Sequence, residues 1–287
     1  RSYNLYRMLL NPFYLLLLVS FWIIGLSFVE YCVIALIISN FAVVLVRIIV
    51  AFANTPFLGK IYSPLTILAQ SAHFALAGIA DPLYQQADKV LLLWLLGSQN
   101  LGIYAVALSA SAAVGSLTNS AGAVTFTMAA QEKHAAGHER IFTIFRLSTL
   151  LWLLLGGILV ILMQWVLPLV YGNEFIPAVA PARLMIAGSA FAALSLQLEQ
   201  ALRGQGRAFV GLEGRLGGLL VMACLGIPLS KYFSLNGICF AFVVANLFCL
   251  AIVSLRTLNH YKLPFKASLI LPGITDLLSY LKWLKKC

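Results

Sequence analysis

Apolar residues fall into eight long runs that are separated by short polar stretches. Each run holds roughly 20 residues or more, the length with which an α-helix crosses a ~30 Å hydrocarbon core. The runs lack the alternation of apolar and polar positions that is typical of membrane β-barrels. The pattern predicts an all-α, polytopic helical membrane protein with about eight transmembrane helices. We expect them at residues 12–29, 31–53, 69–96, 101–130, 148–171, 178–202, 209–232 and 237–258.

Composition and charge support this class and add an orientation. Hydrophobic residues make up 62% of the chain and charged residues 10%, with a mean hydropathy of +0.96, whereas soluble domains are only ~45–50% apolar. Lysine and arginine near helix ends stay on the cytoplasmic side. With the N-terminus inside, sixteen of the nineteen basic residues lie on the inner side or at inner helix ends. We therefore expect cytoplasmic termini, and a net charge of +10 that faces anionic lipid and not nucleic acid.

Two function classes are disfavoured. The five cysteines and four histidines are scattered without metal-ligand spacing, so we expect no metal site and no cofactor. The outer connections at residues 97–100 and 172–177 are too short to supply the acid, base and phosphate-binding groups of a membrane enzyme. We expect that the protein is not an enzyme.

The third run carries charges inside an apolar segment. Asp81, Tyr84 and Asp88 recur at i, i+3 and i+7 and share one helix face, and Gln85 and Lys89 lie on an adjoining face. A charge in a spanning segment is costly and usually marks a substrate or ion pathway. These five residues are therefore candidates for such a pathway. In the alternative reading, Asp88 closes a buried salt bridge between helices and only fixes their packing.

Three further residues join the candidates. The fourth run is rich in small and hydroxylated residues, which favour close helix packing or a polar cavity wall, and it includes Asn119. Arg183 lies within a predicted membrane segment and Arg146 at an inner helix end. Arg183 has an equally good alternative role as an outer-end anchor that pairs with Glu174.

Other residues predict packing features. Pro82 removes a backbone donor and is expected to bend the third helix. Gly214 and Gly218 form a small-xxx-small pair, which predicts a packing seam. Glu199 and Arg203 stand at i and i+4, which predicts a modest structural ion pair.

Four stretches carry a family resemblance through their order and spacing. They are Ala87-Asp88-Lys89 with Leu101-Gly102-Ile103-Tyr104-Ala105-Val106-Ala107, then Pro168 to Ala178, Leu202 to Arg207, and Tyr3-Asn4-Leu5-Tyr6-Arg7 with Pro12. Together they resemble the O-antigen and polysaccharide repeat-unit flippases of the multidrug/oligosaccharidyl-lipid/polysaccharide exporter superfamily. The resemblance spans nearly the whole chain.

The resemblance implies two six-helix lobes around a central cationic cavity in the bacterial inner membrane. Such transporters flip undecaprenyl-pyrophosphate-linked oligosaccharide repeat units by alternating access, for lipopolysaccharide and other surface polysaccharide biosynthesis. Residues 1–60 would be the last two helices of the N-lobe, 61–262 the six-helix C-lobe, and 263–287 a cytoplasmic amphipathic basic tail. The chain is expected to lack the family's first four helices.

The same resemblance suggests roles and partners. Lys89 and Arg183 would offset the pyrophosphate charge and Arg146 would meet it on entry, while Asp88, Asp81 and the polar fourth helix would bond sugar hydroxyls. Expected partners are a lipid-linked oligosaccharide, membrane lipids, and a polysaccharide polymerase or glycosyltransferases. Two alternatives stay open: a drug or cation exporter of the same superfamily, which would favour acidic cavity residues, and a non-transporting membrane assembly subunit or truncated fragment.

Overall fold

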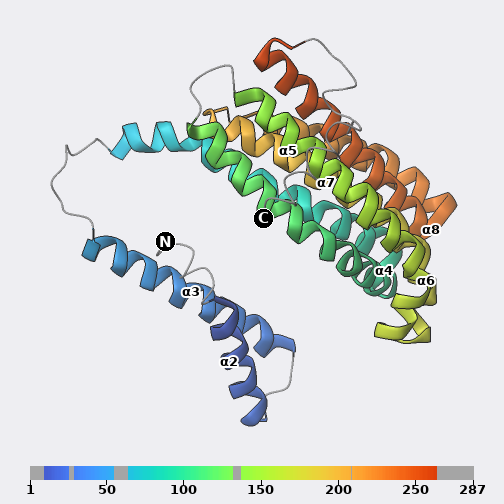
Figure 1. Ribbon diagram of the computed structural model, residues 1–287. Coiled ribbons are helices and arrows are strands. Elements are labelled where there is room, and N and C mark those ends of the chain that lie inside the picture. Colours follow the sequence, from blue (N-terminus) through green and yellow to red (C-terminus); the bar gives the residue numbers. More distant parts are fainter. Residues whose placement is uncertain (1–9, 26–28, 55–63, 132–136, 208, 264–287) are drawn as a thin grey trace, which may run out of the picture. The chain divides into compact units, whose positions relative to one another are not determined.

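The fold is helical throughout the part of the chain that the computed structural model describes, which comprises residues 10–25, 29–54, 64–131, 137–207 and 209–263. This confirms the predicted all-α class. The order of elements (Figure 1) is α2 (Leu10–Ile23), α3 (Val29–Asn54), α4 (Pro64–Gln131), α5 (Gly137–Leu151), the π-helix η1 (Trp152–Gly156), α6 (Gly157–Tyr171), the 3-10 helix η2 (Asn173–Ala178), α7 (Val179–Gly204) and α8 (Phe209–Tyr261).

The described helices include five stretches that are long and apolar enough to cross a membrane. In a lipid environment a spanning segment must satisfy its backbone polar groups internally, which an uninterrupted helix does. The polytopic membrane fold is therefore confirmed. The five stretches are Glu30–Val50, Pro82–Ala112, Glu139–Tyr171, Asn173–Gly204 and Phe209–Tyr261.

Two of the long helices are kinked, and each covers two of the predicted runs. The backbone of α4 leaves helical angles at Gly97 (φ 79°, ψ −179°), and that of α8 does so at Ser234 (φ 50°, ψ −128°). The conformation of Gly97 is essentially restricted to glycine. Asn100 donates its side-chain amide to the Leu96 carbonyl at 2.9 Å. The predicted four-residue loop at 97–100 is thus replaced by a break at the single residue Gly97. Pro82 lies inside α4, and the bend expected there stays a prediction.

The fifth predicted run starts too late. Instead of starting at residue 148, the helix begins at Gly137 and continues without interruption through α5, η1 and α6. Hydropathy misses this first part because it contains Glu139, Arg140 and Arg146. A helix can extend beyond the hydrocarbon core when long polar side chains reach water.

The chain divides into two compact units, Arg1–Pro64 and Leu65–Cys287. In the first unit α2 and α3 pack against each other, with Phe21 and Tyr31 in edge contact at 6.0 Å between ring centroids. The assignment of residues 1–60 and 61–262 to two transporter lobes stays a prediction. The basic tail predicted at 263–287 lies, apart from Leu263, outside the described residues.

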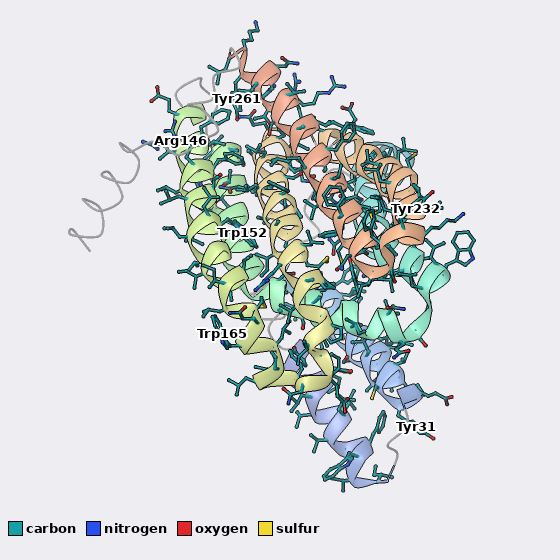
Figure 2. The ribbon with its side chains drawn as sticks, turned by 90° about the vertical axis from the view of Figure 1, so that its right-hand side faces the viewer. Tyr31, Arg146, Trp152, Trp165, Tyr232 and Tyr261 are labelled. Carbon is teal, nitrogen blue, oxygen red and sulfur yellow. The ribbon has the colours of Figure 1, made fainter. Side chains whose placement is uncertain are left out.

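The second unit is a bundle of α4 to α8 around an apolar core that includes Leu92, Phe145 and Met185. The second half of α4 runs parallel to α7, because Ser111 contacts Ser189 and, at the same sequence spacing, Gly122 adjoins Gln200. Large apolar side chains also cover the outside of the bundle. Trp165 of α6 is 58% exposed (Figure 2) and Leu169 is 85% exposed, as expected of a surface that faces acyl chains.

Candidate functional site

The second unit contains a cavity of about 360 Å³ between α4, α7 and α8, with polar and apolar side chains in its wall. This volume lies in the ~300–1,000 Å³ range of small-molecule sites. Gln85 and Ala112 of its wall are exposed, so the cavity opens to the surface. The polar groups of the wall come from Tyr84, Gln85, Ser111, Ser189, Ser195, Glu199, Arg215 and Asn246.

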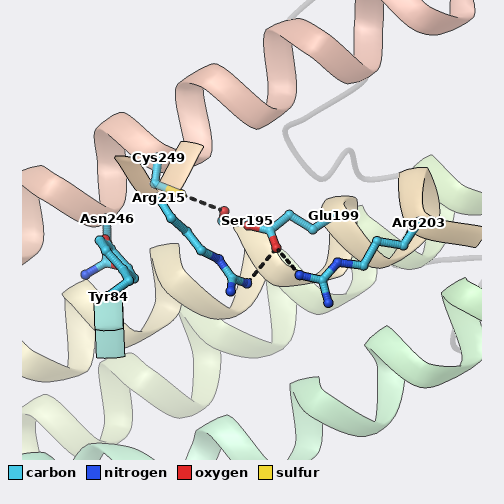
Figure 3. Close-up of polar contacts among 7 residues, drawn as sticks. All are labelled: Tyr84, Ser195, Glu199, Arg203, Arg215, Asn246 and Cys249. Atoms are coloured by element: carbon cyan, nitrogen blue, oxygen red, sulfur yellow. Dashed lines mark hydrogen bonds and ion pairs between the residues drawn. The ribbon is translucent and has the colours of Figure 1, made fainter. Parts of the chain in front are cut away.

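A buried ion pair occupies one side of the cavity. The Arg215 guanidinium of α8 donates to Oε2 of Glu199 on α7 at 2.6 Å, and Nη2 of Arg203 lies 3.6 Å from the same oxygen (Figure 3). The side chains of Glu199 and Arg215 are only 2% and 6% exposed. Burial of two charges is costly and persists only where they compensate each other closely. This is the strongest electrostatic feature of the cavity.

Glycines on α8 make room for this arrangement. A Cβ atom at Gly211, one turn before Arg215, would lie 2.7 Å from Oε2 of Glu199, so a side chain there would force the carboxylate to shift. A Cβ at Gly218 would lie 2.8 Å from the Tyr84 ring. Gly214 instead adjoins Cys249 in the second half of α8. The predicted packing seam is thus confirmed at both glycines, with Gly214 packed against the second half of α8 and Gly218 against Tyr84 of α4.

Hydrogen bonds between helices fix the rest of the wall. The Tyr84 hydroxyl donates to Oδ1 of Asn246 at 3.0 Å, and Nδ2 of Asn246 donates to a carbonyl of its own helix at 2.9 Å. Ser195 and Cys249 lie 3.3 Å apart at their Oγ and Sγ atoms (Figure 3). Hydroxyls and amides both donate and accept. Such a wall is chemically suited to the hydroxyl groups of a sugar.

Of the predicted pathway residues, Tyr84 and Gln85 line the cavity. Asp88 shares the face of Tyr84 and is 4% exposed, but it does not line the cavity. Its carboxylate accepts a hydrogen bond from the Tyr104 hydroxyl beyond the Gly97 kink, and another from the Lys89 backbone N–H at 2.9 Å. The structure thus gives Asp88 a hydroxyl partner where the alternative reading expected a salt bridge.

The basic candidates lie away from the cavity wall. Lys89 donates from Nζ to the Gln85 carbonyl at 3.0 Å and to Oε1 of Gln86 at 2.8 Å, both on its own helix. Arg183 donates from Nε to the Val160 carbonyl of α6 at 3.0 Å. Arg183 therefore anchors α7 to α6, and among the described residues it forms no salt bridge with Glu174.

Arg146 lies in α5, where its guanidinium is 3.4 Å from the Thr143 hydroxyl. It lies toward the same end of the second unit as Tyr261 (Figure 2). Asp81 and Asn119 both lie in α4, but their side chains are outside the described part of the structure. Roles of these residues in a substrate pathway stay predictions.

Sequence reasoning missed the central pair. Arg215 counted only as an inner-end basic residue, and Glu199 only as the partner of Arg203. Both are nevertheless charges within predicted apolar runs, the same signal that singled out Asp88. Glycines one turn to either side of Arg215 were a second signal, because they leave space for partners from other helices.

A known protein family matches the part of the chain that supplies one wall of this site. The polysaccharide biosynthesis protein family matches residues 7–180, more than half of the chain. The chain belongs to this family. Family membership supports a role in polysaccharide biosynthesis and agrees with the coarser part of the predicted resemblance. The matched range includes the α4 wall of the cavity, and Glu199 and Arg215 lie beyond it. No curated protein and no solved structure matches the chain significantly.

Proposed function

We propose that this member of the polysaccharide biosynthesis protein family flips undecaprenyl-pyrophosphate-linked oligosaccharide repeat units across the bacterial inner membrane by alternating access. The observation that carries the proposal is the buried Arg215 guanidinium on the wall of the cavity, within a membrane-spanning stretch. Family membership supports a role in polysaccharide biosynthesis, with which a lipid-linked oligosaccharide substrate agrees.

The chemistry of the cavity divides between the two parts of such a head group. A guanidinium matches the geometry of phosphate oxygens through a bidentate fork, which makes Arg215 the expected pyrophosphate contact. Hydroxyl and amide groups of Ser111, Ser189 and Asn246 would bond the sugar. The polyprenyl tail would stay in the bilayer beside the apolar outer surface of the bundle.

The protein would move the lipid-linked oligosaccharide without making or breaking a covalent bond. The connection between α6 and α7 is only Gly172 and the short helix η2, which offers little surface for catalytic groups. Basic residues at one end of the second unit, among them Arg203, Arg207 and Arg256, favour a cytoplasmic location of that end. Partners would be the lipid-linked oligosaccharide and, at that surface, a polymerase or glycosyltransferases.

Binding of the lipid-linked oligosaccharide is the first test. We expect the chain, purified in detergent, to bind it in native mass spectrometry, and Arg215→Lys to weaken binding by about tenfold. Lysine keeps the charge opposite Glu199 but loses the bidentate fork, at a cost of roughly 1–2 kcal/mol. The matched control is Arg140→Lys, because Arg140 is exposed at the start of α5 and does not line the cavity.

Transport is the second test. In proteoliposomes, the oligosaccharide should become accessible to an impermeant glycosidase on the opposite leaflet, and more slowly with Arg215→Lys. Equal binding by the wild type and Arg215→Lys would contradict the role of Arg215. Absence of binding by the wild type would contradict the proposed substrate.

A further inference from the structure

A second pocket lies at the end of the second unit where α7 ends and α8 both begins and ends. Its volume is about 340 Å³. Leu202 and Val210 form its apolar wall. The polar and charged wall consists of Arg207, Glu213, Arg256, Asn259, His260 and Lys262. None of these residues lines the cavity described above.

The charge of this pocket is strongly positive. Three of its side chains are cationic and one is anionic, and the anionic Glu213 is paired with Nε of Arg256 at 2.8 Å. Within the described ranges, neither Arg207 nor Lys262 forms a salt bridge with a carboxylate. Among the residues that the structure describes, these two cations have no acidic partner, which is the composition of an anion site.

Backbone turns hold both cations in place. After α7, Gly206 takes a positive φ of 80°, and the Arg207 N–H bonds to the Leu202 carbonyl at 2.9 Å. After α8, Lys262 itself takes a positive φ of 53°, and the next N–H, of Leu263, bonds to the Leu258 carbonyl at 3.0 Å. Both turns are helix C-terminal caps of the Schellman type. They direct the chain so that Arg207 and Lys262 line the same pocket.

Side-chain contacts join the two turns. Gln205, in the first turn, donates from Nε2 to the Tyr261 hydroxyl at 2.8 Å and contacts the His260 ring through Oε1. The pocket is therefore formed by two turns that contact each other directly, and Arg207 and Lys262 each belong to one of these turns.

Apolar surface continues beside the basic pocket. A neighbouring hollow of about 430 Å³ shares Glu213, Arg256 and Asn259 with it and is otherwise lined by Ile252 and Leu255. Leu255 is 53% exposed. A free phosphate would use only the charged pocket, whereas a lipid would place its phosphate there and its acyl chains along Ile252 and Leu255.

We propose that this pocket binds the phosphate head group of an anionic phospholipid of the membrane leaflet at the basic end of the bundle. Basic pockets between membrane helices on the cytoplasmic side are suited to such head groups. The site is separate from the cavity of the proposed function. Bound lipid would fix the two turns against each other where α7 connects to α8.

The test measures which lipids the protein retains. The chain is placed in nanodiscs of phosphatidylcholine with an equal amount of phosphatidylglycerol, extracted in mild detergent and examined by native mass spectrometry. We expect retained phosphatidylglycerol to exceed phosphatidylcholine. Arg207→Gln and Lys262→Gln should each lower that preference by about fivefold, the effect of one basic residue near the membrane surface. The matched control, Arg140→Gln, removes an exposed cation outside the pocket and should leave the preference unchanged.

Three results would overturn the proposal. One is equal retention of both lipids by the wild type, and another is a loss of preference in Arg140→Gln as large as that in Lys262→Gln. The third is displacement of bound phosphatidylglycerol by undecaprenyl diphosphate added at the same concentration as the lipid, or by millimolar inorganic phosphate. Thermal unfolding of each variant checks that the fold is kept, which is expected because Arg207 and Lys262 are exposed.

Discussion

Asp88 and Glu199 are both buried carboxylates within membrane-spanning stretches, but their partners differ in kind. Asp88 accepts hydrogen bonds from a tyrosine hydroxyl and a backbone N–H. Glu199 accepts from the guanidinium of Arg215 and adjoins that of Arg203. Only Glu199 lines the cavity. Both carboxyl groups have the hydrogen-bond partners that a buried polar group requires, but of the two only Glu199 forms a salt bridge.

The difference lies in what the partner can still do. A tyrosine hydroxyl can donate one hydrogen bond, and Tyr104 donates it to the carboxylate of Asp88. Tyr104 is itself fully buried, so this contact joins the two halves of α4 across the Gly97 kink. A guanidinium has five N–H donors, more than one carboxylate accepts. Arg215 donates to Glu199 on the wall of the cavity, so an anion that entered the cavity would meet a guanidinium, which makes the second carboxylate part of a site.

Removal of Glu199 should produce the largest effect. Glu199→Gln leaves the Arg215 charge buried without its counter-ion, which is expected to lower the free energy of unfolding by about 3–5 kcal/mol. The double variant Glu199→Gln/Arg215→Met should recover much of that loss, because the remaining cation, Arg203, is 23% exposed and can be hydrated. Chemical denaturation in detergent micelles, followed by circular dichroism or tryptophan fluorescence, measures both.

A second Glu–Arg pair of this chain is the matched control. Glu213 and Arg256 are 46% and 55% exposed, so Glu213→Gln should cost only about 0–1 kcal/mol. Equal costs at Glu199 and Glu213 would show that burial of the Glu199 pair has no energetic consequence, and the contrast with Asp88 would lose its basis.

Gly211 gives an intermediate effect on the same pair. A Cβ atom there would lie 2.7 Å from Oε2 of Glu199, so Gly211→Ala must displace the carboxylate and should cost about 1–3 kcal/mol. Gly157→Ala is the control, because nothing lies within 4 Å of its Cβ position and alanine is the better helix former by up to ~1 kcal/mol. The two variants should shift the denaturation midpoint in opposite directions, and a shared direction would refute the close contact at Gly211.

Much of the fold could be predicted from hydropathy alone. Apolar runs identified the helices because lipid-facing and buried positions are both apolar in a membrane bundle. Residues 97–100 were mistaken for a loop, since four polar or small residues look like a break, although Gly97 alone provides the turn. The start of α5 was missed for the opposite reason, because its polar first turns extend beyond the apolar run.

The candidate site was only half predictable. Tyr84 and Gln85, which helical spacing placed on adjoining faces of α4, both line the cavity. Helical spacing could not place Glu199 opposite Arg215, because the contact joins α7 to α8 and depends on the register between the two helices. Local spacing instead favoured the i, i+4 partner Arg203, whose contact at 3.6 Å is the longer of the two.

Tyr104→Phe tests the other carboxylate and should have the smallest effect. The substitution removes the hydroxyl that donates to Asp88 but keeps the buried ring, so we expect a loss of about 1 kcal/mol in the free energy of unfolding. Because neither Tyr104 nor Asp88 lines the cavity, binding of the lipid-linked oligosaccharide should match that of the wild type in native mass spectrometry. A tenfold loss of binding, as expected for Arg215→Lys, would instead return Asp88 to the substrate pathway that its position in an apolar run predicts. Stability and binding, both measured for Tyr104→Phe and for Arg215→Lys, therefore decide whether Asp88 and Glu199 differ in function or only in their partners.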